Sequence, residues 1–115
     1  MIAVMCRSAL MVYELRTLLA ERNYCVLAGT DGMENHAEWL ASRLKNTFIT
    51  HVLYEPYFFT DPARFRILSP ETMFIIMSSP GEERQTQKAF ACGAGAVIHK
   101  PLVSDELFEV LNFAE

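Results

Sequence analysis

The chain has 115 residues, of which 51% are hydrophobic and 21% charged, and its formal net charge is -4. This length predicts a single domain over residues 1–115, and a chain of this size buries roughly two thirds of its unfolded surface on folding. The hydrophobic share excludes an intrinsically disordered chain. No apolar run reaches the ~18 residues that a membrane-spanning helix needs, so no membrane partner is expected.

The cysteines indicate the cellular compartment of the protein, and the charge balance indicates which classes of partner it binds. Cys6, Cys25 and Cys92 form no CxxC pair, which predicts free thiols in a reducing cytoplasm. The first apolar stretch lacks the preceding basic residues of a secretory signal. An acidic chain without a cluster of Lys and Arg is not expected to bind nucleic acid.

The first part of the chain alternates between strand and helix patterns. Residues 2–5 form a continuous apolar run, typical of a strand buried on both faces. Ser8 suits a helix cap, and apolar side chains then recur at helical spacing as far as Asn23, which suits a left-handed stop. Residues 24–28 predict a second strand, and residues 35–45 predict a second helix.

The middle of the chain predicts two further strands around a short helix. Residues 50–54 form the third strand, which ends before Pro56 because proline cannot donate to a strand ladder. Three aromatic residues follow at 57–59, and they cannot all point inward. The pair Asp61-Pro62 suits the start of one short helix, and residues 72–77 form the fourth strand.

The last third of the chain adds two helices and one strand. Ser79-Pro80 predicts a helix cap and first helical residue, and Gly93 suits the end of the same helix. Residues 96–99 predict the fifth strand. Ser104 opens a final helix with acidic residues in its first turn.

Five strands that alternate with helices and short loops predict one parallel α/β sheet with helices on both faces. In such a sheet, ligands bind beyond the carboxyl ends of the strands. The candidate site residues at those ends are Cys6, Arg7, Glu55, Ser78 and Lys100. No glycine-rich loop follows the first strand, which argues against nucleotide binding, and no cofactor is expected.

The last part of the sequence resembles the end of response-regulator receiver domains. There a Gly-Ala pair, here Gly93-Ala94, precedes the fifth strand, and a Lys-Pro pair, here Lys100-Pro101, follows it. Residues 74–79 are similar to their fourth strand, which ends in Ser or Thr, and Ser78 lies 22 residues before the lysine, a spacing typical of the family. The resemblance covers essentially the whole chain and implies the flavodoxin-like fold of the chemotaxis regulators, with strand order 2-1-3-4-5.

The positions that carry chemistry in this family are different here. Receiver domains phosphorylate an Asp at the end of the third strand and hold Mg2+ with an acidic pair after the first strand. The acceptor position here is Glu55, and Cys6 and Arg7 replace the acidic pair. Because Mg2+ needs several hard oxygen ligands, the sequence predicts a degenerate receiver, or pseudo-receiver, without bound metal or aspartyl phosphorylation.

The replaced residues suggest a locked switch. We expect Glu55 to pair with Arg7 and Lys100, with Ser78 as a further partner by the family's geometry. The family's switch aromatic, three residues before the lysine, is Val97 here. The resemblance also implies that a protein partner, or a second copy in a homodimer, binds the face of the fourth helix, fifth strand and fifth helix. The residues expected there are Gln85, Lys88, Ala96, Ile98, Leu107, Phe108 and Leu111.

Alternatives stay open on function and on single residues. One alternative function is a phosphorylation-competent receiver of a phosphorelay, modified on another carboxylate or by an unusual kinase. Another is the regulatory module of a longer transcription factor or enzyme. Cys6 is either a redox thiol or, as we favour, a small buried apolar residue. The aromatic run 57–59 is either core or a partner-binding patch.

Overall fold

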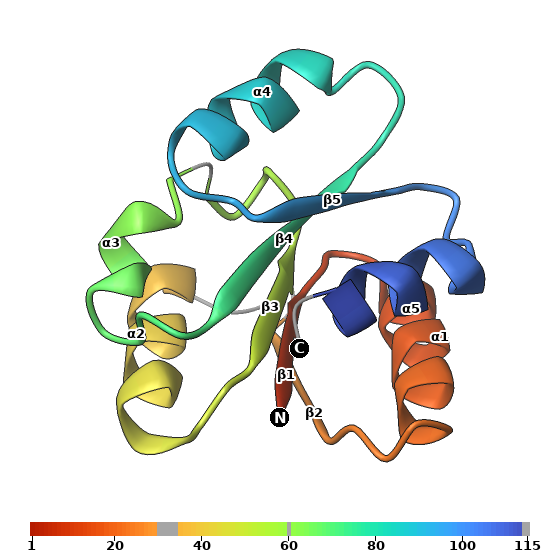
Figure 1. Cartoon of the computed structure of the whole chain (residues 1–115), viewed down its shortest axis with the longest axis horizontal. Helices are drawn as coiled ribbons and strands as arrows, with labels where there is room; N and C mark the ends of the chain where they lie inside the picture. The colour runs from red at the N-terminus through yellow and green to blue at the C-terminus, as the bar shows by residue number, and fades with distance from the viewer. Residues whose placement is uncertain (30–34, 60, 114–115) are drawn as a thin grey trace.

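The computed structural model describes residues 1–29, 35–59 and 61–113, which form a central sheet between two layers of helices (Figure 1). Five parallel strands pair in the order β2-β1-β3-β4-β5. The strands are β1 (Ile2–Met5), β2 (Val26–Gly29), β3 (His51–Tyr54), β4 (Met73–Ser78) and β5 (Ala96–His99). The predicted fold class and strand order are confirmed.

The helices divide between the two faces of the sheet. They are α1 (Ala9–Ala20), α2 (His36–Asn46), α3 (Ala63–Arg66), α4 (Glu83–Ala91) and α5 (Ser104–Phe113). Helices α1 and α5 pack on one face, and α2, α3 and α4 lie over the other (Figure 1). None of the helices in the described parts of the chain is long and apolar enough to span a membrane.

The predicted cap Ser8 and the predicted stop Asn23 are confirmed, whereas Asn35, predicted as the first residue of the second helix, is its cap. At the start of α1, the Ser8 hydroxyl accepts a hydrogen bond from the Met11 N–H at 3.2 Å. The Asn35 side-chain oxygen accepts one from the Glu38 N–H at 3.0 Å at the start of α2. Asn23 has a φ of 65°, the left-handed conformation that stops the chain from continuing α1. These interactions join residues that are close in the sequence, so they fix the ends of the helices without long-range contacts.

The start of α4 differs from the prediction. The Ser79-Pro80 pair does not open the helix, which begins at Glu83. Gly81 has a φ of 90°, which is incompatible with a right-handed helix, so residues 79–82 form a loop. The Glu82 carboxylate accepts a hydrogen bond from the Ser79 N–H at 2.8 Å and stabilises that loop. The predicted end is correct, because Gly93 follows α4 with a φ of 113°.

An aromatic cluster fills the layer between the sheet and α3. The Tyr54 ring stacks on Phe59 with 4.3 Å between ring centres, and Phe59 lies 4.9 Å from Phe65. Phe74 completes the cluster, and all four side chains are buried. Phe65 is the buried residue of α3, and its large ring packs this single helical turn on the core.

The opposite layer is aliphatic and joins α1 and α5 to the sheet. Leu15 and Leu19 of α1 belong to the same buried cluster as Ile98, Leu107 and Leu111. The expectation that these last three residues face a partner is therefore wrong. Each apolar side chain is directed into the core, which stabilises the domain and leaves none of them available for docking.

Candidate functional site

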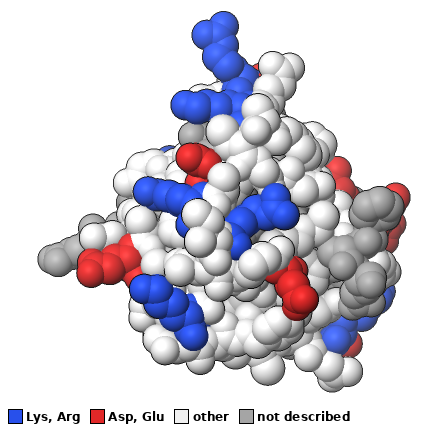
Figure 2. Space-filling view, turned by 60° about the vertical axis from the view of Figure 1, so that its left-hand side comes forward, with Lys and Arg blue, Asp and Glu red and all other residues white. Residues whose placement is uncertain are grey.

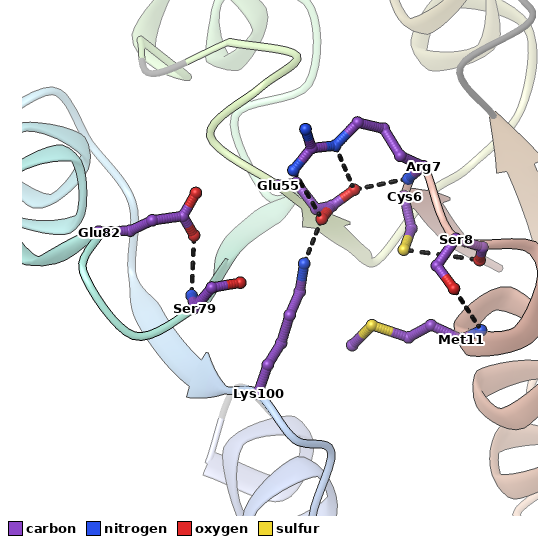
Figure 3. Close-up of polar contacts among 8 residues, drawn as sticks. All are labelled: Cys6, Arg7, Ser8, Met11, Glu55, Ser79, Glu82 and Lys100. Carbon is purple, nitrogen blue, oxygen red and sulfur yellow. Dashed lines mark hydrogen bonds and ion pairs between the residues drawn. The ribbon is translucent and has the colours of Figure 1, made fainter.

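The carboxyl ends of three strands bring three charged residues to one edge of the sheet (Figure 3). Arg7 follows β1, Glu55 follows β3 and Lys100 follows β5. Because β3 lies between β1 and β4, and β5 pairs with β4, the Glu55 carboxylate is central in this group. Arg7 and Lys100 approach it from two sides (Figure 3).

The Glu55 carboxylate is buried and fully engaged. Its side chain is 3% exposed. Oε1 accepts hydrogen bonds from the Arg7 backbone N–H at 2.5 Å and from Arg7 Nε at 3.4 Å. Oε2 forms ion pairs with Arg7 Nη2 at 3.4 Å and with the Lys100 ammonium group. Both oxygens are therefore occupied by donors from the chain itself.

The electrostatics of this pocket keep Glu55 ionised. Burial by itself raises the pKa of Glu55, because water no longer solvates the carboxylate charge. Hydrogen bonds from Lys100 and Arg7 outweigh the burial and hold the pKa of Glu55 below its usual value. Two positive charges thus face one negative charge, and the group as a whole is cationic.

Arg7 is positioned by an aromatic ring as well as by Glu55. Its guanidinium carbon lies 4.6 Å from the centre of the Tyr57 ring, a cation–π contact. The Tyr57 side chain is 53% exposed, whereas Phe59 is buried, so the aromatic run is divided between surface and core. Sequence reasoning missed this role of Tyr57, although its place two residues after Glu55 was an available signal.

Cys6 lies next to Arg7 but is shielded from solvent. Its side chain is buried, and Sγ lies 3.8 Å from the Ser8 carbonyl oxygen. Burial raises the pKa of the Cys6 thiol, and this effect outweighs the hydrogen bond to Ser8 and the charge of Lys100, which lower it. A neutral, inaccessible thiol is a poor nucleophile. The structure therefore favours a packing role for Cys6.

Ser78 stands at the end of β4 but contacts α4 rather than Glu55. Its hydroxyl oxygen accepts a hydrogen bond from the Thr86 hydroxyl at 2.9 Å. No hydrogen bond among the described residues joins Ser78 to Glu55, so the expected partnership is wrong. Sequence reasoning missed Thr86, because the late start of α4 is what places this residue in the first turn, opposite Ser78.

The donors around Glu55 do not fit the Mg2+ site of the family that the sequence resembles. Both Glu55 oxygens accept from Arg7 or Lys100, and Cys6 offers a protonated thiol. Mg2+ requires several hard oxygen ligands in octahedral array. Across residues 1–29, 35–59 and 61–113, no group of three or more His, Cys, Asp or Glu residues is arranged to hold a metal ion.

The remainder of the predicted partner face consists of two exposed polar residues and two half-buried apolar ones. Gln85 and Lys88 are exposed on α4, and Ala96 is half-buried in β5. Phe108 is half-buried, and the Arg22 guanidinium carbon lies 4.2 Å from the centre of its ring. The accessible part of this face therefore consists mainly of the outer side of α4.

Val97 occupies the position of the family's switch aromatic. It is half-buried in β5 and packs against the aromatic cluster on the α3 side of the sheet. Valine is aliphatic and, being β-branched, has few rotamers, so residue 97 offers no aromatic ring that could move between a buried and an exposed orientation.

Comparisons with known proteins identify solved structures with a similar fold. No protein-family model and no curated protein matches the sequence. NtrX from Brucella abortus matches with a TM-score of 0.81 and 16% identity, over 98% of this chain and 26% of that one. A response regulator receiver domain protein from Clostridium thermocellum matches with a TM-score of 0.80 and 19% identity, over 98% and 91% of the two chains.

A third similar structure was solved in a phosphorylated form. It is a response regulator protein from Burkholderia pseudomallei with a phosphorylated aspartic acid, a calcium ion and citrate. The match has a TM-score of 0.72 and 13% identity, over 96% of this chain and 65% of that one. The chain thus spans 26% of NtrX and less than two thirds of this protein. Its fold is the flavodoxin-like fold of response-regulator receiver domains.

Proposed function

We propose that this chain is a pseudo-receiver domain, which signals through protein contacts and is not phosphorylated on Glu55. The observation that carries the proposal is the Glu55 carboxylate, whose two oxygens are engaged by Arg7 and Lys100. The receiver fold and the lysine after β5 support a receiver origin. Arg7 and Cys6, in place of an acidic pair, support the loss of phosphorylation.

Charge is the first obstacle to metal binding at this site. At about 4 Å and an effective dielectric constant near 20, two unit charges interact with roughly 4 kcal/mol before desolvation is counted. The Arg7 guanidinium and a divalent cation would compete for the single carboxylate of Glu55. A metal ion loses translational entropy when it binds, whereas the Arg7 side chain is already attached to the chain. Arg7 is therefore favoured as the partner of the Glu55 carboxylate.

The second obstacle is the nucleophile. Acyl-phosphate formation needs a carboxylate oxygen that is free to attack phosphorus. Glu55 Oε1 accepts from the Arg7 backbone and side chain, and Oε2 pairs with both cations. Glu also extends one methylene further than Asp, into the space that a phosphoryl group would fill. Attack would therefore require breaking a buried ionic network.

A domain with a locked pocket acts through a surface of fixed shape. The accessible candidates of the predicted face are Gln85 and Lys88 on α4, and Ala96 in β5 is half-buried. A protein partner in a signalling pathway, or a second copy of the chain, would bind there. In this proposal the domain is a regulator rather than an enzyme, because no residue of the pocket is assigned a reaction.

Beryllofluoride with Mg2+ mimics the phosphoryl group of receiver domains and tests the proposal. We expect the amide NMR signals of residues 7, 55, 78 and 100 to stay unchanged when both are added. The matched control is the triple variant C6D/R7D/E55D, which restores the acidic pair and the Asp acceptor and should show large shifts. Shifts at these residues in the natural chain would overturn the proposal.

A second candidate function is that of a regulatory module in a longer protein. It is favoured by the match to NtrX, of which this fold makes up only 26%. In that case the locked pocket would hold the module in one state toward a neighbouring output domain. The length of the open reading frame that encodes the chain distinguishes this candidate from a stand-alone domain.

A further inference from the structure

Strand β5 forms one edge of the sheet, so one side of its backbone has no strand to pair with in the described parts of the chain. On its other side, the Lys100 N–H that follows β5 donates to the Ser78 carbonyl oxygen of β4 at 2.8 Å. Successive residues of a strand direct their N–H groups to opposite sides, so the His99 N–H points to the free edge. An N–H at such an edge needs an acceptor from a side chain or from water.

Glu106, in the first turn of α5, supplies that acceptor. Its Oε1 accepts a hydrogen bond from the His99 backbone N–H, and its Oε2 lies 2.9 Å from His99 Nδ1. Burial raises the pKa of Glu106, but the hydrogen bonds from His99 outweigh this effect and hold the pKa of Glu106 below its usual value. The next residue, Leu107, is fully buried and fixes this turn against the sheet. The Glu106 carboxylate therefore ties the end of β5 to the start of α5.

Lys100 lies between this tie and the Glu55 pocket. Its backbone directly follows His99, and its side chain extends from the end of β5 to the Glu55 carboxylate (Figure 3). His99 and Lys100 also line a cavity of about 430 Å³, which Thr86 of α4 borders as well. Because there is open space beside the Lys100 side chain, the position of its backbone decides whether the ammonium group reaches Glu55.

We propose that Glu106 is a positioning residue that couples α5 to the Glu55 pocket. It holds His99 at the end of β5, and the next residue, Lys100, thereby stays within reach of the carboxylate. A protein that binds α5 and displaces Glu106 would loosen the Lys100–Glu55 pair, and by linkage a change at Glu55 would alter the tie between α5 and β5. The coupling acts on the pocket that the proposed function treats as a lock, so it rests on that function.

Other side chains near the end of β5 do not provide the same link. Val97 packs on the α3 side of the sheet, whereas α5 covers the opposite side. Glu83 of α4 lines the same cavity as Lys100, but its carboxylate accepts a hydrogen bond from the Gly81 N–H at 3.3 Å. Within the described residues, Glu106 is the charged side chain of α5 that bonds to β5.

Acylation of the lysines with a limiting amount of acetic anhydride, mapped by peptide mass, tests the coupling. Lys45 on α2 and Lys88 on α4 are exposed and serve as internal references. Figure 2 turns the side of these helices forward and shows Lys and Arg side chains that project from the surface, with Asp and Glu between them. The Lys100 side chain is 20% exposed and bonded to Glu55, so we expect it to react about tenfold more slowly than both references.

The variant E106A removes the tie and should raise the acylation rate at Lys100 about threefold, the size of effect that a partly exposed ion pair gives. Lys45 and Lys88 should react as before. E109A removes the same charge from an exposed position one turn later on α5, and should leave Lys100 as slow as in the natural chain. H99A keeps the Glu106 carboxylate but removes the ring that it binds, so a rise at Lys100 in this variant does not come from lost negative charge.

E55Q distinguishes a failure of this coupling from a failure of the proposed function. It removes the charge that holds Lys100, and should raise the acylation rate there about tenfold. No rise in E55Q would contradict the locked pocket itself. A rise in E55Q that is missing in E106A, or in H99A, would overturn the coupling alone. So would an equal rise in E109A, or a rise in E106A that Lys45 and Lys88 share, since the first would report charge and the second a general opening of the domain.

Discussion

The Glu55 carboxylate orders its pocket through contacts within the chain. It accepts hydrogen bonds from three donor groups of Arg7 and from the Lys100 ammonium group. The Tyr57 ring supports Arg7 from the solvent side. Each of these contacts is intramolecular and is therefore present without any ligand.

Removal of the charge on Glu55 should destabilise the domain. We expect E55Q to lower the free energy of unfolding at pH 7 by about 2 kcal/mol. This is less than the 3–5 kcal/mol typical of a broken buried pair, because the Arg7 side chain is 43% exposed and water can solvate it. Urea unfolding measures the change. E14Q, at an exposed position of α1, is the control and should change stability by less than about 0.5 kcal/mol.

The E55Q variant also tests how the free energy of unfolding depends on pH in the acidic range. The pKa of Glu55 is lowered on folding, so its contribution is complete above the usual value of 4.5 and is lost as the pH falls through the folded value. The difference in stability between the natural chain and E55Q should therefore shrink below pH 4.5. Urea unfolding at a series of acidic pH values measures it, and a difference that stays constant would contradict the assignment.

The cysteines should differ sharply in reactivity. Cys25 is exposed, whereas Cys6 is buried and burial raises the pKa of its thiol. We expect iodoacetamide at neutral pH to alkylate Cys25 first and Cys6 only when the domain unfolds. Peptide mass mapping over time measures the order. Rapid alkylation of Cys6 in the folded chain would restore the redox interpretation.

At the scale of single residues, the sequence could predict which site residues lie together only where each residue directly follows a strand. Residues that directly follow a strand, such as Arg7, Glu55 and Lys100, could be placed together because parallel strands end at one edge of the sheet. The partner of Ser78 could not be predicted, because it depends on where α4 begins. Nor could the contact of Tyr57 with Arg7, because it depends on the path of a loop.

At the scale of elements, the four-residue helix α3 packs on the core through its buried residue Phe65. The F65A substitution removes a buried ring from the aromatic cluster, and we expect it to lower the free energy of unfolding by about 3–5 kcal/mol. The neighbouring I67A should change it by less than about 0.5 kcal/mol, because Ile67 is almost fully exposed. Equal losses in the two variants would contradict the packing described.

Element boundaries were predictable where a side chain or glycine fixes them locally. Ser8, Asn23 and Gly93 act within their own segment, and the structure confirms them. Asn35, predicted as the first helical residue, is instead the cap of α2. The start of α4 was wrong because the Ser79-Pro80 pair satisfies the local rules of a helix start, whereas Gly81 turns the chain away with a positive φ.

At the scale of the whole molecule, the alternation of strands and helices was sufficient to predict a parallel sheet. The strand order came from the family resemblance, since hydrophobic patterns do not state which strands are neighbours. The side of each helix did not follow either. The family resemblance, and not a hydrophobic pattern, placed Ile98 and Leu107 on a partner surface, although they fill the layer between the sheet and α5.

Intact mass after incubation with acetyl phosphate and Mg2+ tests the central claim most directly, because it counts phosphoryl groups on the folded chain. The natural chain should keep its mass, while C6D/R7D/E55D should gain the mass of one phosphoryl group under the same conditions. A phosphoryl group on the natural chain, located at Glu55 by fragmentation, would contradict the account.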